Sequence, residues 1–346
     1  MTVDEKYMHR CLQLALIGTG QVAPNPMVGA VLVYNDTIIA EGFHQHYGQA
    51  HAEVNCINAV SKEQEKLLSK STLYVSLEPC AHYGKTPPCT DLIIKNNIPK
   101  VVIGCPDSYK QVAGKGIEKL KTAGVQVTVG VLQKEALELN KRFFTFHQKQ
   151  RPYIILKWAQ SHDNKIGGLN HQRTFISNDI SNRLVHQWRS EEASILVGTN
   201  TALIDNPSLT TRLVPGKNSV RLVIDMDLKL STDLQLFDKT VKTMVFNGVK
   251  EEVNDRISFF KIDRNNISQL LEILYKQNIQ SILVEGGAKL LQSFIDADLW
   301  DEARVITNAD LIIGEGVQAP QLNSSIVDTK HIFGSDRVVF YLNDKL

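Results

Sequence analysis

The chain alternates short apolar runs with segments whose apolar residues recur at helical spacing. In its first half, strand-like runs at residues 71–77, 100–105 and 125–131 are separated by helix-like segments at 89–98 and 114–124. A helix between two strands is the usual crossover that connects parallel neighbours in one sheet. The alternation therefore predicts α/β domains, in which helices cover the faces of a mainly parallel sheet.

Further elements surround this series. A helix at 7–16, two strands within 28–43 joined by a turn at an Asn-Asp pair, and a helix at 51–60 precede it. A helix over 133–146 closes it. The first domain is therefore expected to end near residue 147.

The polar residues 147–152 separate this half from a second α/β series, because Pro152 disfavours helix and the composition shifts there. A chain of 346 residues is long enough for two domains of the usual size, about 100–200 residues each. We place the first domain at 1–147 and the second at 148–346. The second series is expected to have strands at 153–159, 194–198, 221–225 and 281–287, and helices at 176–190, 267–277 and 288–297.

Charge and composition restrict the binding partners and the compartment. The formal net charge of +1 argues against a protein that binds the nucleic-acid backbone through clustered Lys and Arg. Acidic residues near the N-terminus and the lack of an apolar run of about 18 residues argue against a signal peptide and a membrane span. Five cysteines in so long a chain do not form a disulfide framework. We expect a cytoplasmic protein, and the sequence leaves its oligomeric state open, a homo-oligomer included.

Residues that can bind a metal occur in and near one loop. Cys80 and Cys89 flank a stretch that contains a Pro pair, and a disulfide, a metal site or plain packing could each explain two thiols there. Upstream, His51 and Glu53 open the helix expected at 51–60. One imidazole and two thiolates supply three zinc ligands and leave the fourth tetrahedral position to water. In a reducing compartment we favour a zinc site with the ligands His51, Cys80 and Cys89.

The position of Glu53 suggests the chemistry of that site. Zinc lowers the pKa of a bound water toward neutrality, which makes hydroxide available to attack an amidine-like carbon. Glu53 would take the water's proton and deliver it to the departing amine. This combination is typical of the zinc nucleobase deaminases. The remaining cysteines are interpreted as packing residues: Cys11, Cys56 and Cys105.

Three stretches carry a resemblance to a known family: "NPMVG" at 25–29, "GFHQHYGQAHAE" at 42–53, and the cysteine loop, which has eight residues between its cysteines where the general deaminase signature has two. They resemble the deaminase half of the bifunctional riboflavin-biosynthesis deaminase–reductases through most of residues 1–147. The resemblance implies a cytidine-deaminase-like three-layer domain. It also implies a diaminopyrimidinone substrate that carries a ribosylamino 5-phosphate. The residues implied to hold this substrate are Asn25, His44, His82, Lys85 and Thr86.

In the second half, a strand runs into Gly286 and Gly287 and then into a helix. A helix N-terminus behind glycines offers N–H groups to an anion such as a dinucleotide pyrophosphate, although the six-residue Rossmann fingerprint does not follow any expected strand. The stretch "LVGTNTALIDNPSLTTR" at 196–212 resembles the reductase half of the same family. That resemblance implies a dihydrofolate-reductase-like fold, NADPH as the cofactor, and hydride transfer to C1′ of an opened ribose or its imine.

The same resemblance implies the residues of the second site. Those near the cofactor are Gln160, Phe175, Thr201, Asp205, Gly287, Ala288, Lys289 and Leu290. Those near the substrate are Lys157, Arg173, Arg189, Leu209, Arg212 and Glu285. Two stretches depart from the family pattern: its Ser-Leu-Asp-Gly stretch is "SHDNKIGG" at 161–168 here, and Phe175 stands where the family has Trp.

The sequence thus predicts a bifunctional enzyme that deaminates a small phosphorylated pyrimidine with zinc and then reduces its ribosyl chain with NADPH. Three alternatives stay open. The second half could be a degenerate reductase. A nucleic-acid deaminase with a nucleotide-sensing domain would need a basic surface and a shorter cysteine spacing. A non-catalytic binding protein with structural zinc would need a fourth protein ligand, which is not evident.

Overall fold

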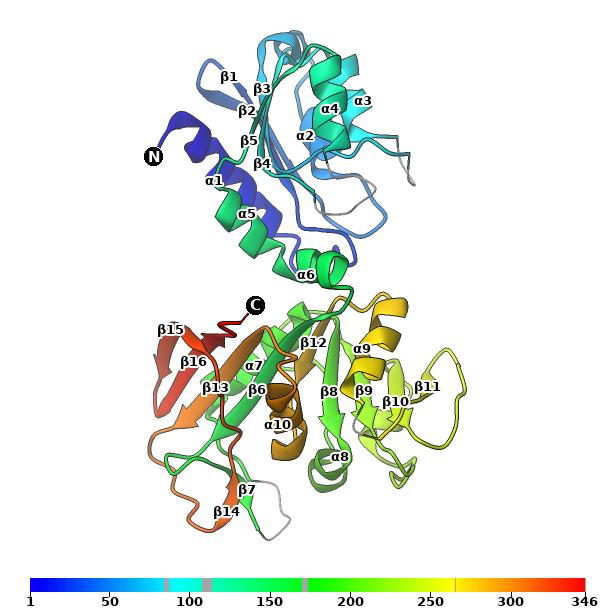
Figure 1. Cartoon of the computed structure of the whole chain (residues 1–346). Coiled ribbons are helices and arrows are strands. Elements are labelled where there is room, and N and C mark those ends of the chain that lie inside the picture. Colours follow the sequence, from blue (N-terminus) through cyan, green and yellow to red (C-terminus); the bar gives the residue numbers. More distant parts are fainter. Residues whose placement is uncertain (84–86, 108–113, 170–173, 265, 346) are drawn as a thin grey trace. The chain divides into compact units, whose positions relative to one another are not determined.

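The computed structural model describes residues 1–83, 87–107, 114–169, 174–264 and 266–345. They form two compact units, Met1–Gln150 and Arg151–Leu346 (Figure 1). Both units are α/β structures, so the predicted fold class is confirmed. Among the described helices, none has both the length and the apolar character that a membrane span requires.

The first unit is built on a five-stranded sheet in the order β2-β1-β3-β4-β5. Strands β3, β4 and β5 are parallel, whereas β1 is antiparallel to both β2 and β3. The expected turn between β1 and β2 lies at Asn35 and Asp36, whose φ angles of 45° and 57° suit a tight hairpin. The strands are β1 (Gly29–Tyr34), β2 (Thr37–Phe43), β3 (Thr72–Leu77), β4 (Lys100–Cys105) and β5 (Gln126–Val129).

Helices cover both faces of this sheet and make it the middle of three layers (Figure 1). On one face, α2, α3 and α4 contribute Cys56, Ile93 and Leu120 to a core shared with β1, β3 and β4. On the other face, α1 packs Tyr7 and Met8 against the opposite side of the same strands. The helices of this unit are α1 (Val3–Leu16), α2 (Ala52–Asn58), η1 (Glu65–Lys70), α3 (Cys89–Lys95), α4 (Lys115–Thr122), α5 (Gln133–Leu139) and α6 (Lys141–Lys149).

The single helix expected over 133–146 is wrong, because the structure has two helices, α5 and α6, that meet at Asn140. Asn140 leaves helical geometry with φ −108° and ψ 23°. Its buried amide donates to the Met27 carbonyl and accepts from the Met27 N–H, each at 2.8 Å. These two bonds to a distant segment replace the continuation of the helix, and no local pattern of apolar residues records them.

The second unit has a nine-stranded sheet in the order β11-β10-β9-β8-β12-β6-β13-β16-β15. The strands from β11 to β13 are parallel, and β16 and β15 add an antiparallel hairpin at one edge. A separate pair, β7 and β14, lies outside it. The strands are β6 (Tyr153–Gln160), β7 (Lys165–Gly168), β8 (Ser194–Gly198), β9 (Val220–Ile224), β10 (Thr243–Asn247), β11 (Ile257–Lys261), β12 (Ser281–Val284), β13 (Glu302–Asn308), β14 (Gly316–Gln318), β15 (Ile326–Phe333) and β16 (Asp336–Leu342).

Helices again cover both faces of the large sheet. Leu270 of α9 and Phe294 of α10 pack on one face, and Val185 of α7 and Ala202 of α8 pack on the other. The helices are α7 (Asp179–Glu191), α8 (Thr199–Asp205), η2 (Gln235–Phe237), α9 (Ile267–Lys276) and α10 (Ala288–Asp296). The parallel strands therefore end among helix N-termini, as in other α/β folds that bind ligands at such edges.

We expect Asn140→Ala to destabilise the first unit by about 2–3 kcal/mol, because it leaves the buried polar groups of Met27 without partners. Urea denaturation followed by circular dichroism would measure this loss. The three tryptophans, Trp158, Trp188 and Trp300, all lie in the second unit. Their fluorescence transition is therefore the internal control, and an equal shift of both transitions would contradict the local role of Asn140.

Candidate active sites

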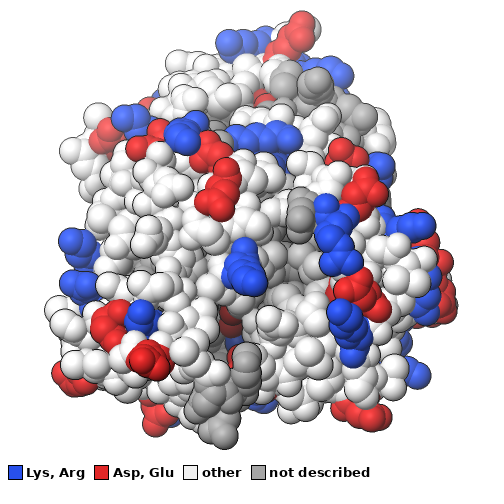
Figure 2. Space-filling model, turned by 60° about the horizontal axis from the view of Figure 1, so that its bottom comes forward, with Lys and Arg blue, Asp and Glu red and all other residues white. Residues whose placement is uncertain are grey.

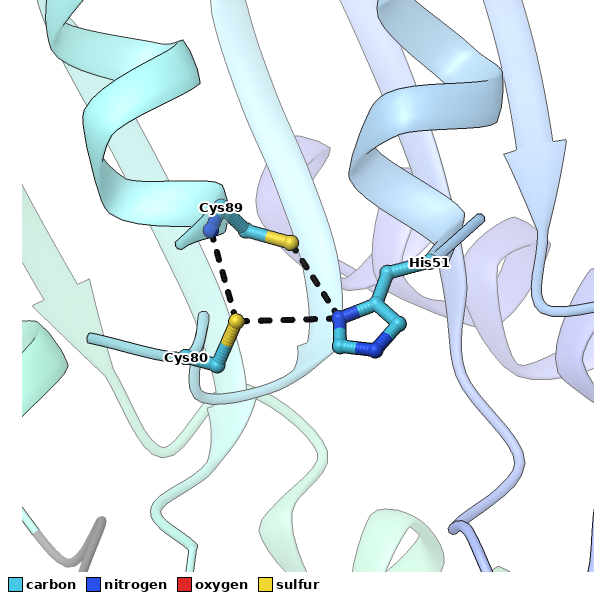
Figure 3. A group of neighbouring side chains, drawn as sticks. All are labelled: His51, Cys80 and Cys89. Carbon is cyan, nitrogen blue, oxygen red and sulfur yellow. Dashed lines mark hydrogen bonds between the residues drawn. The ribbon is translucent and has the colours of Figure 1, made fainter. Parts of the chain in front are cut away.

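Three side chains converge at one edge of the first sheet (Figure 3). His51 precedes α2, Cys80 follows β3, and Cys89 is the first residue of α3. The Nδ1 atom of His51 lies 3.6 Å from the Cys80 sulfur and 3.3 Å from the Cys89 sulfur. All three donor atoms lie within 4.8 Å of one another, and no fourth His, Cys, Asp or Glu of the described residues joins them.

This geometry fits zinc. Tetrahedral zinc with Zn–S and Zn–N bonds of about 2.3 and 2.0 Å places the sulfur and nitrogen ligands about 3.5 Å apart. The observed separations of 3.3 and 3.6 Å are close to that value. Three ligands leave one position open, which is the arrangement of catalytic zinc sites.

Cys80 and Cys89 hold one proton between them, because their pKa values shift in opposite directions. A hydrogen bond with Cys89 lowers the pKa of Cys80 to about 4, and the backbone N–H of Cys89 also donates to the Cys80 sulfur at 3.3 Å. The same bond between the side chains, together with burial, raises the pKa of Cys89. A metal ion would take the place of the remaining proton, because thiolates and not thiols bind zinc.

Glu53 lies in the first turn of α2 with 3% of its surface exposed. Burial raises its pKa to about 7, and the Cys80 thiolate adds to the shift. A carboxyl group that titrates near neutrality both accepts and releases a proton readily, as a general base that later acts as an acid must do.

The structure brings two predicted substrate residues to this centre. His44 is buried, its ring lies 5.5 Å from that of His51, and its Nδ1 donates to the Ala50 carbonyl at 2.9 Å. Its Nε2 then accepts from the Asn25 amide at 3.1 Å, which leaves the Asn25 oxygen as an acceptor. Burial lowers the pKa of His44, so the ring is neutral. His82 is exposed, and the predicted residues Lys85 and Thr86 lie outside the described residues.

The sequence analysis missed Glu78, which positions the cysteine loop. This buried carboxylate accepts backbone N–H groups of Asp107, Gly114, Gly116 and Ile117 at 2.9–3.3 Å and thereby ties the start of α4 to the end of β3. A side chain on Gly116 would come within 2.0 Å of the Pro79 carbonyl oxygen. An acidic residue directly between a buried strand and Pro-Cys is the signal that could have identified it.

In the second unit, a buried charge cluster lies where β12 ends. Glu285 accepts two hydrogen bonds from the Arg189 guanidinium at 2.7 and 2.6 Å, and the Lys157 ammonium lies 3.8 Å away. Burial opposes the ionisation of Glu285, but Arg189 and Lys157 outweigh it and lower its pKa to about 2. Burial lowers the pKa of Lys157. The structure thus brings three predicted substrate residues into contact.

The glycines after β12 make a close approach to α8. A Cβ atom on Gly286 would lie 2.7 Å from the Thr201 side chain, and Gly287 adopts φ 82°, which favours glycine. Gly287 also precedes α10 without a side-chain cap, so the helix N–H groups at its start are available. The predicted cofactor residues Ala288, Lys289 and Leu290 form the first turn of that helix.

The remaining predicted residues of the second site are more dispersed. Asp205 ends α8, and the Gln160 side chain bonds to Trp158 and Asn164 at 2.7 and 2.8 Å. Phe175 is 76% exposed. The predicted residue Arg173 lies outside the described residues.

Charges of both signs are interspersed on the face that Figure 2 shows, without a continuous basic stripe among the described residues. This pattern agrees with the net charge of +1. It gives the alternative of a nucleic-acid deaminase no support on that face, because such a protein would need a basic surface for the phosphate backbone.

Comparison with known proteins identifies the two halves. Residues 1–105 match the model of the cytidine and deoxycytidylate deaminase zinc-binding region, and residues 152–332 match the RibD C-terminal domain. The fold and the sites therefore define a zinc-binding deaminase joined to a reductase.

Relatives match over nearly the whole chain. The riboflavin biosynthesis protein RibD of Bacillus amyloliquefaciens is 40% identical, with 95% of this chain and 92% of that protein covered. The RibD protein of Aquifex aeolicus is 36% identical, with 98% of each chain covered. A crystal structure of a deaminase/reductase from Thermotoga maritima is 36% identical, with 99% of each chain covered and a TM-score of 0.91.

The chain belongs to the RibD family of riboflavin biosynthesis proteins. It is a bifunctional enzyme, a deaminase and a reductase, with zinc and NADPH as its cofactors, as predicted.

The charge cluster of the second unit predicts a pH-dependent stability. Because the pKa of Glu285 falls from 4.5 to about 2 on folding, its contribution is complete above about pH 4.5 and is lost as the pH falls toward 2. Glu285→Gln should lower the free energy of unfolding at pH 6 by an amount on the order of 2–3 kcal/mol. The gap to the unmodified protein should narrow as the pH falls.

Urea denaturation followed by tryptophan fluorescence would measure both effects. The exposed Glu272→Gln is the matched control, because it removes an acidic group without a buried partner. A gap that stays constant between pH 6 and 2 would show that Glu285 is not held ionised by its neighbours.

Proposed function

We propose that residues 1–147 convert 2,5-diamino-6-(5-phosphoribosylamino)pyrimidin-4(3H)-one to 5-amino-6-(5-phosphoribosylamino)uracil, and that residues 148–346 reduce the ribosyl chain of that product to ribityl. The Thermotoga relative is described as an enzyme of these two activities. The observation that carries the proposal is the group of His51, Cys80 and Cys89, with its open position and the buried Glu53 beside it.

In the deaminase site, zinc held by His51, Cys80 and Cys89 would make a water molecule acidic enough to ionise near neutral pH. Glu53 receives the proton that the water loses and delivers it to the leaving amine, so that oxygen replaces nitrogen on the ring and ammonia departs. Asn25, fixed by His44, offers its amide oxygen to the pyrimidine. His44 lies beside it, and His82, Lys85 and Thr86 complete the proposed substrate residues.

In the reductase site, the close approach at Gly286 and the uncapped start of α10 fit the pyrophosphate of a dinucleotide. NADPH supplies a hydride, which reduces C1′ of the opened sugar. We assign the cofactor to Gly287 and to a set of residues around it: Gln160, Phe175, Thr201, Asp205, Ala288, Lys289 and Leu290.

The substrate of the reduction meets the charge cluster of the second unit. Glu285 stays ionised and accepts hydrogen bonds from sugar hydroxyls, and Lys157 lies beside it. Arginine side chains suit the phosphate, because a guanidinium forms paired, charge-assisted hydrogen bonds with its oxygens. The proposed substrate residues are Lys157, Arg173, Arg189, Leu209, Arg212 and Glu285.

We expect Glu53→Gln to lower the rate of ammonia release by about 10²–10⁴-fold, because the amide carries no proton to the leaving group. Zinc content, measured by atomic absorption, should stay at one ion per chain. Cys89→Ser should lose both zinc and ammonia release, and the exposed Glu63→Gln should change neither. Loss of zinc from Glu53→Gln would instead give Glu53 a structural role in the site.

The reductase assignment is tested with the purified enzyme and the diaminopyrimidinone substrate, with and without NADPH. We expect ammonia in both samples and a loss of reduced-nicotinamide absorbance only when NADPH is present, with one NADPH oxidised per ammonia released. Lys157→Met should keep ammonia release and slow NADPH oxidation at least tenfold. Ammonia without any NADPH oxidation would make the second unit a degenerate reductase.

A further inference from the structure

The loop at 206–212 carries two proposed substrate residues, Leu209 and Arg212, in a backbone that needs support. Leu209 has φ 51°, in the left-handed region that is unfavourable for a branched side chain, and its side chain is buried in the core under α7. A residue holds such a conformation only when its surroundings fix it. The direction of the Arg212 side chain therefore depends on the contacts that fix the backbone of this loop.

Two buried side chains outside the loop hold its backbone. Arg221, which is fully buried, donates from Nε to the Ser208 carbonyl at 2.8 Å. His186 of α7, which is 6% exposed, receives the Arg212 N–H at its Nδ1 atom at 3.0 Å. A backbone N–H can only donate, so Nδ1 is the acceptor and the ring proton lies on Nε2.

The bond at His186 links the proposed phosphate ligand to the charge cluster. His186 and Arg189 are three residues apart and share one face of α7, where Arg189 binds Glu285. The Arg212 side chain is exposed and donates to the hydroxyl groups of Ser208 and Thr210 in its own loop. The backbone bond at His186 sets where this residue stands relative to Arg189.

We propose that His186 is a positioning residue of the reductase, which holds the backbone at Arg212 so that its guanidinium meets the substrate's phosphate. This inference rests on the proposed function, which counts Arg212 among the arginines of the substrate site, and it takes Arg212 as the one that meets the phosphate. His186 itself does not have to touch the substrate.

Burial and the surrounding charges keep the His186 imidazole neutral, so that its Nδ1 atom can accept the Arg212 N–H. Burial lowers the pKa of His186 to about 4, and the neighbouring cations, Arg189, Arg212 and Lys157, act in the same direction against the single anion Glu285. The ring is therefore neutral at ordinary pH, and Nδ1 keeps its lone pair for Arg212. A protonated ring would lose this bond and place two donors against each other.

The test uses two variants of His186 that differ in one property. His186→Asn keeps a side-chain acceptor close to the place of Nδ1, whereas His186→Leu has similar bulk and no acceptor. The reductase reaction is measured with NADPH and either 5-amino-6-(5-phosphoribosylamino)uracil or the same compound without its phosphate. The quantity compared is the phosphate preference, which is the ratio of kcat/KM for the two compounds.

We expect His186→Leu to lower the phosphate preference about 5- to 10-fold, through a higher KM for the phosphorylated compound, because one hydrogen bond is lost. His186→Asn should retain most of the preference. Ammonia release and the Kd for NADPH should be unchanged in both variants. An equal loss with both compounds, or equal behaviour of Leu and Asn, would overturn the proposal in favour of a merely structural role.

A double-mutant cycle with Arg212→Ala separates this inference from the function on which it rests. If His186 acts through Arg212, His186→Leu should change the phosphate preference no further in the Arg212→Ala enzyme. An additional loss in that background would refute the link. If Arg212→Ala leaves the phosphate preference intact, the proposed role of Arg212 is wrong and this inference fails with it. If only Arg212→Ala lowers it, this inference fails alone.

Discussion

The first active site depends on one buried strand ending between two helix N-termini. β3 is buried from Leu73 to Leu77, so its end is fixed, and Cys80 follows it after two residues. His51 and Cys89 stand at the starts of α2 and α3, and the Cys89 N–H donates to the Cys80 sulfur. The metal-binding geometry therefore follows from the sheet topology.

Buried polar side chains hold the segments next to this edge of the first sheet. The Glu78 carboxylate accepts three N–H groups at the start of α4 and that of Asp107 after β4. The absence of a side chain at Gly116 lets that helix lie against the Pro79 carbonyl. In the same unit, Asn140 fastens Met27, which lies two residues after Asn25. Buried polar groups satisfied by backbone partners thus fix both the loop that carries the cysteines and the segment that carries the proposed substrate residue Asn25.

The sequence predicted the metal-binding and catalytic residues better than it predicted the residues that hold them in place. His51, Glu53, Cys80 and Cys89 are recognisable because zinc hydrolysis needs those residue types in short motifs, and the strand–helix alternation placed them correctly. The break at Asn140 and the bond between His186 and Arg212 could not be predicted, since each joins residues far apart in sequence. The hairpin of β15 and β16 was also not assigned. Nearly all of β15 is exposed, so its sequence lacks the alternation of buried and exposed positions that marks a strand.

Each site contains a buried carboxyl group, and the pKa values of the two groups are shifted in opposite directions. The direction of the shift determines whether the group can carry a proton. Burial and the nearby Cys80 thiolate raise the pKa of Glu53 to about 7, which suits a group that must carry a proton. Glu285 is buried between Arg189 and Lys157, which lower its pKa to about 2. A carboxylate held so firmly in its charged form accepts hydrogen bonds, as the proposed sugar contact requires, but it is a poor source of a proton. In the same cluster, burial lowers the pKa of Lys157, whereas the Arg189 guanidinium stays protonated.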